Sequence, residues 1–350
     1  MKAVVFDGPY KVSIQERPIP RIQEETDIIV DVSYTALCGS ELHVFRGIEK
    51  CSPGFIMGHE FTGTVKEVGS QVKSVKVGDR VVSPFTVSCG ECFYCKNSFS
   101  SRCTKNLLFG SPDLDGGQAE FVRVPLADGT VVKAPDGIKD HALILMADIF
   151  PTGFFGAKNA FSLLTPEQIA NSTAVVIGCG PVGLCAVISA LSFKPKKVFA
   201  IDSVESRLEL AERLGAEPLN FAEDREGMKR RVREETDGRG ADLVIEVVGL
   251  SPALKTAYNL VRPFGIISSI GVHNGEIPWT GAQGYDKNLR VQMGRCPVRS
   301  VFPEALQLFE QKQDLFGFMF EKIMPLSEAV EAYDIFNKMQ VQKVVFEAKK

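Results

Sequence analysis

Residues 173–183 read TAVVIGCGPVG and decide the fold class of the chain. A short apolar run predicts a strand over Ala174–Ile177, and a helical pattern follows from about Pro181 to Phe193. The turn between them has the pattern G-x-G-x-x-G, in which glycines permit a tight turn and the close approach of a pyrophosphate. The residues of this turn that we expect to bind a dinucleotide are Gly178, Gly180, Pro181, Val182 and Gly183.

The same alternation of strand and helix continues outward from this turn. Val198–Ile201 predicts the next strand, and Glu205–Leu214 predicts a helix with Gly215 as its C-cap. Three further segments extend the pattern, namely Leu243–Val248, Pro252–Val261 and Gly265–Ile270. Repeated βα units with continuous apolar strands predict an α/β domain with a doubly wound parallel sheet, covered by helices on both faces.

Asp202 ends the second predicted strand of this unit. A carboxylate at this distance from the glycine pattern binds the adenosine ribose hydroxyls and repels a 2′-phosphate, so the sequence favours NAD over NADP. Arg207 lies close enough to pair with a phosphate, or it lies on the helix surface. The alternative is a glycine-rich turn of a different α/β fold, with Asp202 as a helix N-cap.

The first half of the chain has a different pattern, with short β-like runs interrupted by glycine and proline. Ile28–Val32, Phe61–Val68 and Arg80–Ser83 are examples, and they predict an irregular, mostly antiparallel β domain. We expect three segments: a β domain over residues 1–150, a dinucleotide-binding domain over 151–294, and a return to the first domain over 295–350.

The overall composition is that of an ordinary globular protein of 350 residues with net charge −3. Acidic and basic residues are well mixed, which indicates neither a nucleic-acid partner nor a membrane surface. No run approaches the ~18 apolar residues that a membrane span needs, and the apolar start is too short for a signal peptide. We therefore expect a cytoplasmic protein with reduced thiols.

Four of the nine cysteines form the pattern C-x2-C-x2-C-x7-C within a lobe over about residues 88–104. These residues are Cys89, Cys92, Cys95 and Cys103. Four clustered thiolates predict a closed, tetrahedral and therefore structural zinc site. This spacing leaves open an iron–sulfur cluster or a redox disulfide.

A second metal site is suggested by Cys38, His59, Glu60 and Asp148. A catalytic zinc takes three protein ligands and keeps one position for water or substrate. Asp148 lies in an apolar run, where an acid is costly unless it is paired or bound to a metal. The alternatives are a small buried cysteine and an aspartate that caps a helix or pairs with a buried partner.

With these motifs, the chain resembles the zinc-containing alcohol dehydrogenases of the medium-chain dehydrogenase/reductase superfamily over essentially its whole length. Gly58-His59-Glu60 with Gly63, Gly69 and Val72 fits the family's zinc signature, and Cys38-Gly39-Ser40 with His43 fits its first-ligand motif. The resemblance implies a GroES-like catalytic domain interrupted by a Rossmann domain. It also implies hydride transfer between NAD(H) and a primary or secondary alcohol, or the matching aldehyde or ketone.

The resemblance also implies roles for individual residues. Cys38, His59 and Asp148 would bind a catalytic zinc, with Glu60 as an alternate ligand or a carboxylate behind the ligands. Ser40 would accept the alcohol proton and pass it toward the cofactor ribose and His43, unless His43 is an ordinary surface histidine. Relatives often have aspartate where this chain has Glu41, a departure that we expect to leave the zinc undisturbed.

The resemblance further places Phe85 and Phe109 in an apolar substrate pocket, although both could equally be core aromatics. Trp279 lies where relatives often make subunit contacts, so we expect a homodimer or a homotetramer. Polyol, formaldehyde and threonine dehydrogenases share these motifs and remain possible. The sequence also leaves room for a zinc-free quinone or enoyl reductase, and for a non-catalytic nucleotide-binding protein on the same scaffold.

Overall fold

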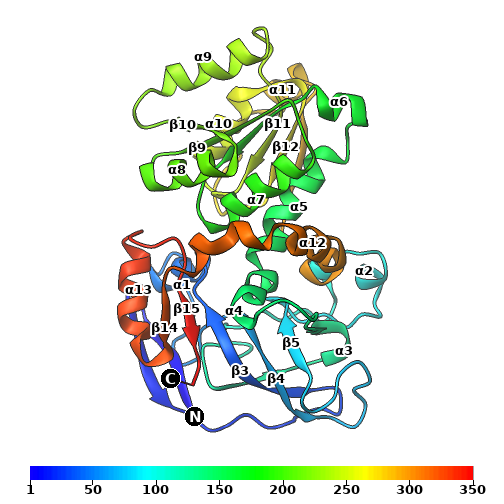
Figure 1. Ribbon diagram of the computed structural model, residues 1–350, viewed down its shortest axis with the longest axis vertical. Helices are drawn as coiled ribbons and strands as arrows, with labels where there is room; N and C mark the ends of the chain where they lie inside the picture. Colours follow the sequence, from blue (N-terminus) through cyan, green and yellow to red (C-terminus); the bar gives the residue numbers. More distant parts are fainter. Residues whose placement is uncertain (350) are drawn as a thin grey trace. The chain divides into compact units, whose positions relative to one another are not determined.

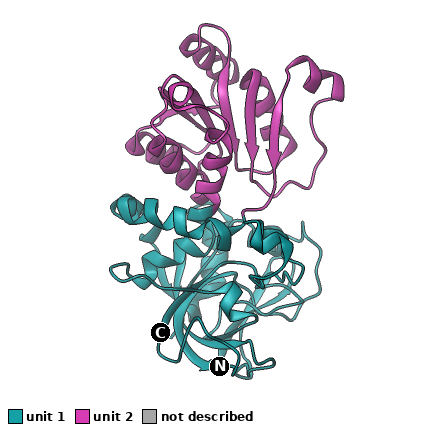
Figure 2. Ribbon diagram, turned by 90° about the vertical axis from the view of Figure 1, so that its right-hand side faces the viewer, with its two compact units in different colours: residues 1–151, 297–350 teal, residues 152–296 magenta. Residues whose placement is uncertain are grey.

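The computed structural model describes residues 1–349, which form two compact units (Figure 2). Unit 1 comprises Met1–Pro151 together with the C-terminal segment from Pro297, and unit 2 comprises Thr152–Cys296. The boundaries expected after residues 150 and 294 differ from these by one and two residues. Helix α5 (Ile149–Phe161) contains the first boundary.

Unit 2 contains one six-stranded, fully parallel sheet with the strand order β10-β9-β8-β11-β12-β13 (Figure 1). Its strands are β8 (Thr173–Ile177), β9 (Lys197–Asp202), β10 (Glu217–Asn220), β11 (Ala241–Glu246), β12 (Val261–Ser269) and β13 (Arg290–Met293). Besides α5, the helices of this unit are α6 (Pro166–Ala170), α7 (Pro181–Ser192), α8 (Glu205–Leu214), α9 (Arg225–Glu235), α10 (Ser251–Leu260) and α11 (Gly281–Asp286). This strand order is the doubly wound Rossmann arrangement, and it confirms the predicted fold class.

The glycine turn lies where the strand order of this sheet reverses. β8 is buried along its whole length and pairs with β9 on one side and β11 on the other. The turn after β8 therefore opens at the switch point, which is where doubly wound sheets bind their ligands.

The predicted end of β11 is wrong. The pattern extends β11 to Val248, whereas the strand ends at Glu246. The buried carboxylate of Glu246 accepts hydrogen bonds from the N–H groups of Val248 (2.8 Å) and Gly249 (2.7 Å), and this local bonding turns the chain away from the sheet.

Unit 1 contains a seven-stranded sheet and a separate two-stranded sheet, β1 (Lys2–Gly8) with β2 (Lys11–Glu16). The strands of the larger sheet are β3 (Ile28–Ala36), β4 (Glu60–Val68), β5 (Arg80–Ser83), β6 (Phe121–Val124), β7 (Val132–Lys133), β14 (Ile323–Pro325) and β15 (Val345–Glu347). All of its pairings are antiparallel except that of β14 with β15, so the expected mostly antiparallel β structure is confirmed.

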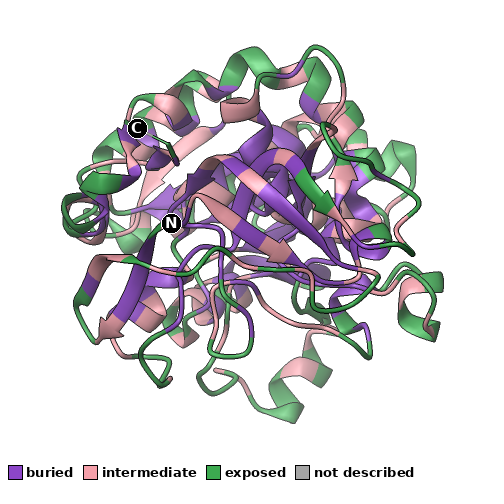
Figure 3. Cartoon of the chain, turned by 90° about the horizontal axis from the view of Figure 1, so that it is seen from below, coloured by how far each residue is buried: buried purple, intermediate pink, exposed green. Residues whose placement is uncertain are grey.

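The α-helices of unit 1 have between 4 and 15 residues, and buried residues concentrate on the strands (Figure 3). The helices of unit 1 are α1 (Glu41–Phe45), α2 (Phe93–Lys96), α3 (Ala127–Thr130), α4 (Asp140–Leu143), α12 (Val298–Lys312) and α13 (Ala329–Asn337). Its 3₁₀ helices are η1 (Ser100–Arg102), η2 (Ile144–Ala147), η3 (Gln313–Phe320) and η4 (Leu326–Glu328). Among the described residues, no helix has the length and apolar character needed to cross a membrane.

Candidate metal and dinucleotide sites

Strand pairing brings the candidate ligands of the second metal site together. β3 and β4 pair antiparallel with Ala36 opposite Glu60. Because Cys38 follows β3 by two residues and His59 directly precedes β4, this register places both beside Glu60. Asp148 reaches the same place from the junction between η2 and α5.

The four side chains offer ligand atoms that all lie within 4.8 Å of one another. Asp148 Oδ2 lies 3.3 Å from His59 Nε2 and 3.6 Å from Cys38 Sγ. All four side chains are buried, and Glu60 has no exposed surface. A thiol, an imidazole and two carboxylates are therefore gathered where water cannot solvate their charges.

The chemistry of this donor set fits a divalent cation such as zinc. Burial, together with the charge of Asp148, raises the pKa of the Cys38 thiol. Burial also raises the pKa of Glu60 to about 7. The Oε1 atom of Glu60 is buried without a hydrogen-bond partner. A bound cation compensates such costs, and sulfur, imidazole and carboxylate are the ligands that zinc takes in proteins.

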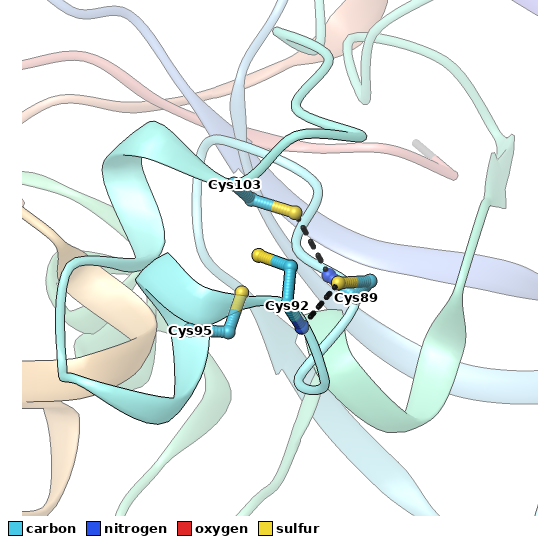
Figure 4. Close-up of side chains that lie close together, drawn as sticks. All are labelled: Cys89, Cys92, Cys95 and Cys103. Carbon is cyan, nitrogen blue, oxygen red and sulfur yellow. Dashed lines mark hydrogen bonds between the residues drawn. The ribbon is translucent and has the colours of Figure 1, made fainter.

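The four-cysteine lobe brings its sulfur atoms into one group as well (Figure 4). Cys103 Sγ accepts hydrogen bonds from the N–H groups of Cys89 (3.2 Å) and Lys105 (3.3 Å), and Cys89 Sγ accepts one from Cys92 (3.3 Å). Backbone hydrogen bonds lower the pKa of the Cys92 thiol to about 6, which favours a thiolate. All nine cysteines are free thiols. Four converging sulfur atoms fit a tetrahedral thiolate site.

The glycine turn has the backbone that its sequence predicts. Gly178 has a φ of +95°, and a Cβ atom there would lie 2.6 Å from Val248 Cγ2. A Cβ atom on Gly183 would collide with the carbonyl oxygen of Gly178, so the helix packs directly against the turn that follows β8. Gly180 is the N-cap of α7 and a Cβ atom on it would meet nothing within 4 Å. Its missing side chain therefore leaves space in front of the helix N-terminus, where phosphates bind.

Asp202 lies beside this turn at the end of β9. Its carboxylate accepts hydrogen bonds from the N–H groups of Cys179 (2.7 Å), Ser203 (2.7 Å) and Val204 (3.0 Å). Arg207 Nη1 lies 3.8 Å from Asp202 Oδ2. The α8 helix begins with Val204 as its N-cap and has no side-chain cap, so Asp202 is not the N-cap of that helix.

Comparison with known proteins assigns the family. The family model of the alcohol dehydrogenase GroES-like domain matches residues 24–136, and that of the zinc-binding dehydrogenase matches residues 181–311. The chain is 67% identical over 348 residues to zinc-type alcohol dehydrogenase B from Aspergillus flavus, covering 99% of this chain and 81% of that relative. The chain belongs to the zinc-containing alcohol dehydrogenase family.

Further members of this family support the same assignment. The AdhB protein of Bacillus subtilis, described as an uncharacterized zinc-type alcohol dehydrogenase-like protein, is 36% identical, and the match covers 96% of this chain and 97% of that protein. The alcohol dehydrogenase TADH from Thermus sp. ATN1 has a TM-score of 0.91 at 34% identity, with 99% of each chain covered. The similarity to these oxidoreductases therefore extends over nearly the whole chain.

The expected relay residues of this dehydrogenase lie in different surroundings. Ser40 Oγ donates a hydrogen bond to Cys38 Sγ (3.3 Å) and lies 3.5 Å from His59 Nε2. His43 lies on α1, and its Nδ1 atom lies 3.7 Å from Oε1 of Glu49. Ser40 is thus in contact with the metal cluster, whereas His43 faces a carboxylate outside it.

The two expected pocket aromatics are also in different surroundings. The ring of Phe85 lies edge-on to His59, with 6.0 Å between ring centroids. Phe109 packs edge-on to Phe61 at 5.1 Å and belongs to the core of the seven-stranded sheet. A pocket role for either residue stays a prediction.

Two residues next to the metal cluster cannot be recognised from the sequence motifs. Lys343 Nζ donates to Glu60 Oε2 at 2.6 Å and to the Leu37 carbonyl oxygen at 3.0 Å. Gln118 donates to the carboxylate of Glu41. Lys343 begins the apolar run Lys343–Phe346, and a charged residue in such a run indicates a buried charge that needs a partner. Asp148 is recognised in its own apolar run for the same reason.

Proposed function

We propose that this dehydrogenase transfers a hydride between NAD(H) and a primary or secondary alcohol, or the matching aldehyde or ketone. Cys38, His59 and Asp148 hold the reactive zinc ion, and Glu60 is an alternate ligand. A second zinc ion, held by the four-cysteine lobe, stabilises the fold.

The observation that carries the proposal is the convergence of four buried ligand groups from three separate segments of unit 1. Burying a thiol, an imidazole and two carboxylates together costs free energy, and Lys343 offsets this cost only at Glu60 Oε2. Their number also supports a reactive site, since three ligands leave one position open and Glu60 can occupy or vacate it.

A zinc ion bound there supplies Lewis-acid polarisation of an alcohol or carbonyl oxygen. Ser40 supports the proton transfer, because its hydroxyl lies in hydrogen-bond contact with Cys38 and close to His59. With zinc and cofactor bound, the Ser40 hydroxyl would accept the alcohol proton while it gives up its own, and His43 would be the expected final receiver. Phe85 beside His59 supports an apolar substrate rather than a polyol.

Asp202 supports NAD as the cofactor. Three N–H groups hold its carboxylate at the edge of the glycine turn. There the carboxylate can accept hydrogen bonds from the ribose hydroxyls, and it repels a 2′-phosphate. Arg207 lies within ion-pair distance of Asp202. The Asp202 carboxylate therefore occupies the positive charge of Arg207, which could otherwise attract a 2′-phosphate.

The test is the metal content per chain by mass spectrometry for the wild type and for Cys38→Ser, together with NADH-linked turnover of a panel of small alcohols. We expect two zinc ions in the wild type, one in the variant, and loss of turnover with the second ion. Cys51→Ser is the matched control, because Cys51 lies outside both clusters. A wild type with a single zinc ion that Cys38→Ser retains, and with activity on quinones or enones, would contradict this proposal. The protein would then be a reductase without a reactive zinc.

A further inference from the structure

We propose that Gln118 and Tyr333 are positioning residues that set the orientation of the His59 imidazole through the carboxylate of Glu41. This role rests on the proposed function in one respect, which is that His59 binds the reactive zinc. Each link of the arrangement lies within unit 1.

The carboxylate of Glu41 lies behind the His59 ring. Glu41 Oε1 is 3.6 Å from His59 Nδ1, whereas Nε2 of the same ring faces Asp148 Oδ2 at 3.3 Å. A carboxylate at Nδ1 keeps the proton there and leaves the Nε2 lone pair for a metal. At 3.6 Å the contact is longer than a hydrogen bond, so the position of Glu41 depends on its further partners.

Gln118 supplies a side-chain contact to that carboxylate. Its Nε2 atom lies 3.3 Å from both carboxylate oxygens of Glu41, and its Oε1 atom accepts a hydrogen bond from the Tyr333 hydroxyl at 2.9 Å. The two partners fix the orientation of the amide, because a flipped amide would turn its oxygen toward a carboxylate. A chain of contacts therefore leads from Tyr333 on α13 to the His59 ring.

Gln118 also contacts the backbone that carries His59. Gly58 has a φ of +98°, and a Cβ atom on it would lie 2.6 Å from both Cγ and the backbone nitrogen of Gln118. The N–H of Gln118 donates to the carbonyl oxygen of Met57 at 2.9 Å. Gln118 thus fixes both the backbone before His59 and the carboxylate behind its ring.

These contacts are costly to interrupt, because Gln118 and Tyr333 have no exposed surface. Removing the Tyr333 hydroxyl leaves Gln118 Oε1 without its donor, so the amide loses one of the two contacts that orient it toward Glu41. Loss of a carboxylate partner behind a metal-binding histidine typically weakens metal binding by about 10- to 100-fold.

The test uses two variants of the full-length protein, Tyr333→Phe and Gln118→Met. Tyr333→Phe removes one oxygen atom and keeps the ring packing against Phe45. Gln118→Met keeps the length of the side chain and removes its amide. Tyr34→Phe is the matched control, since its hydroxyl bonds to Glu347 in the same unit. Zinc affinity is measured by competition with a chromogenic chelator, and the visible absorption spectrum is recorded with Co²⁺ in place of zinc.

We expect both variants to bind the reactive metal more weakly than the wild type, by up to about 10-fold because the Glu41 carboxylate itself stays in place, and to shift its cobalt spectrum, while the four-cysteine zinc stays bound. Tyr34→Phe should match the wild type in both measurements. Folded Tyr333→Phe with wild-type affinity and the wild-type cobalt spectrum overturns the positioning role, even if Gln118→Met fails to fold. A wild type that binds metal only at the four cysteines overturns the proposed function and this inference together.

Discussion

The Nζ atom of Lys343 lies 2.6 Å from Oε2 of Glu60, and neither side chain has any exposed surface. The lysine also donates to the carbonyl oxygen of Leu37. The pair thus places one positive charge directly behind a group of acidic candidate ligands. Since the pair is fully desolvated, its two members depend on each other more strongly than exposed ion pairs do.

Lys343→Met should lower the free energy of unfolding by about 3–5 kcal/mol, because it removes the ammonium partner of the buried Glu60 carboxylate. Chemical denaturation of the zinc-loaded protein measures this loss. Lys338→Met is the matched control, since the Lys338–Asp334 pair is exposed and should contribute less than about 1 kcal/mol. The double variant Lys343→Met with Glu60→Gln should recover part of the stability. Equal stability of Lys343→Met and the wild type would contradict the pairing.

Gly183→Ala and Gly180→Ala should separate folding from cofactor binding. A methyl group at residue 183 collides with the carbonyl oxygen of Gly178, so we expect a loss of about 1–3 kcal/mol in stability. A methyl group at residue 180 meets no protein atom, so stability should hold while the Kd for NADH rises on the order of tenfold or more. Thermal unfolding and NADH fluorescence titration check both expectations. Unchanged NADH affinity in Gly180→Ala would remove the phosphate-binding role of the turn.

Asp202→Asn should move cofactor preference toward NADPH. The amide keeps one of the two oxygens that accept backbone N–H groups, and it removes the negative charge that repels a 2′-phosphate. We expect the ratio of kcat/KM for NADPH to that for NADH to rise on the order of tenfold to a hundredfold, since like charges in contact cost several kcal/mol. Asp224→Asn, at an exposed helix cap, is the control. A wild-type ratio in Asp202→Asn would assign cofactor selection to different residues.

Cys103→Ser should remove the zinc ion of the four-cysteine lobe and leave the reactive ion in place. Serine does not replace a thiolate in a closed zinc site. We expect one zinc ion per chain and faster hydrogen exchange over residues 88–104, measured by mass spectrometry. Iron in the wild-type protein, in place of zinc, would restore the iron–sulfur alternative. Retention of both zinc ions by Cys103→Ser would show that the four sulfur atoms do not form one site.

Local patterns predict much of the Rossmann sheet. β8, α7, β9 and α8 are recognisable because buried parallel strands are continuously apolar and Gly215 ends the last helix with a φ of +105°. β10 and β13 are not predicted, because they are the edge strands and β13 is exposed along its whole length. An edge strand carries little apolar pattern that differs from a loop.

The candidate site is only partly predictable for a related reason. Cys38, His59 and Asp148 can be recognised in the sequence because they are residue types that bind metals. The family resemblance groups them into one site. The contacts of Gln118 with Glu41 and Tyr333 span 77 and 215 residues of chain, and no local period records them. Glutamine and tyrosine are also common in many surroundings, so only the assembled unit 1 indicates their role.

Unit 1 is built from two segments of the chain that the ribosome makes at different times. Its two segments flank the whole of unit 2, and both Tyr333 and Lys343 lie in the second segment. Glu60 is therefore synthesised almost three hundred residues before its partner Lys343, and Gln118 more than two hundred residues before Tyr333. Since domains fold as units during synthesis, unit 1 completes its packing only after the residues of its second segment have been made, although all four candidate ligands lie in its first segment.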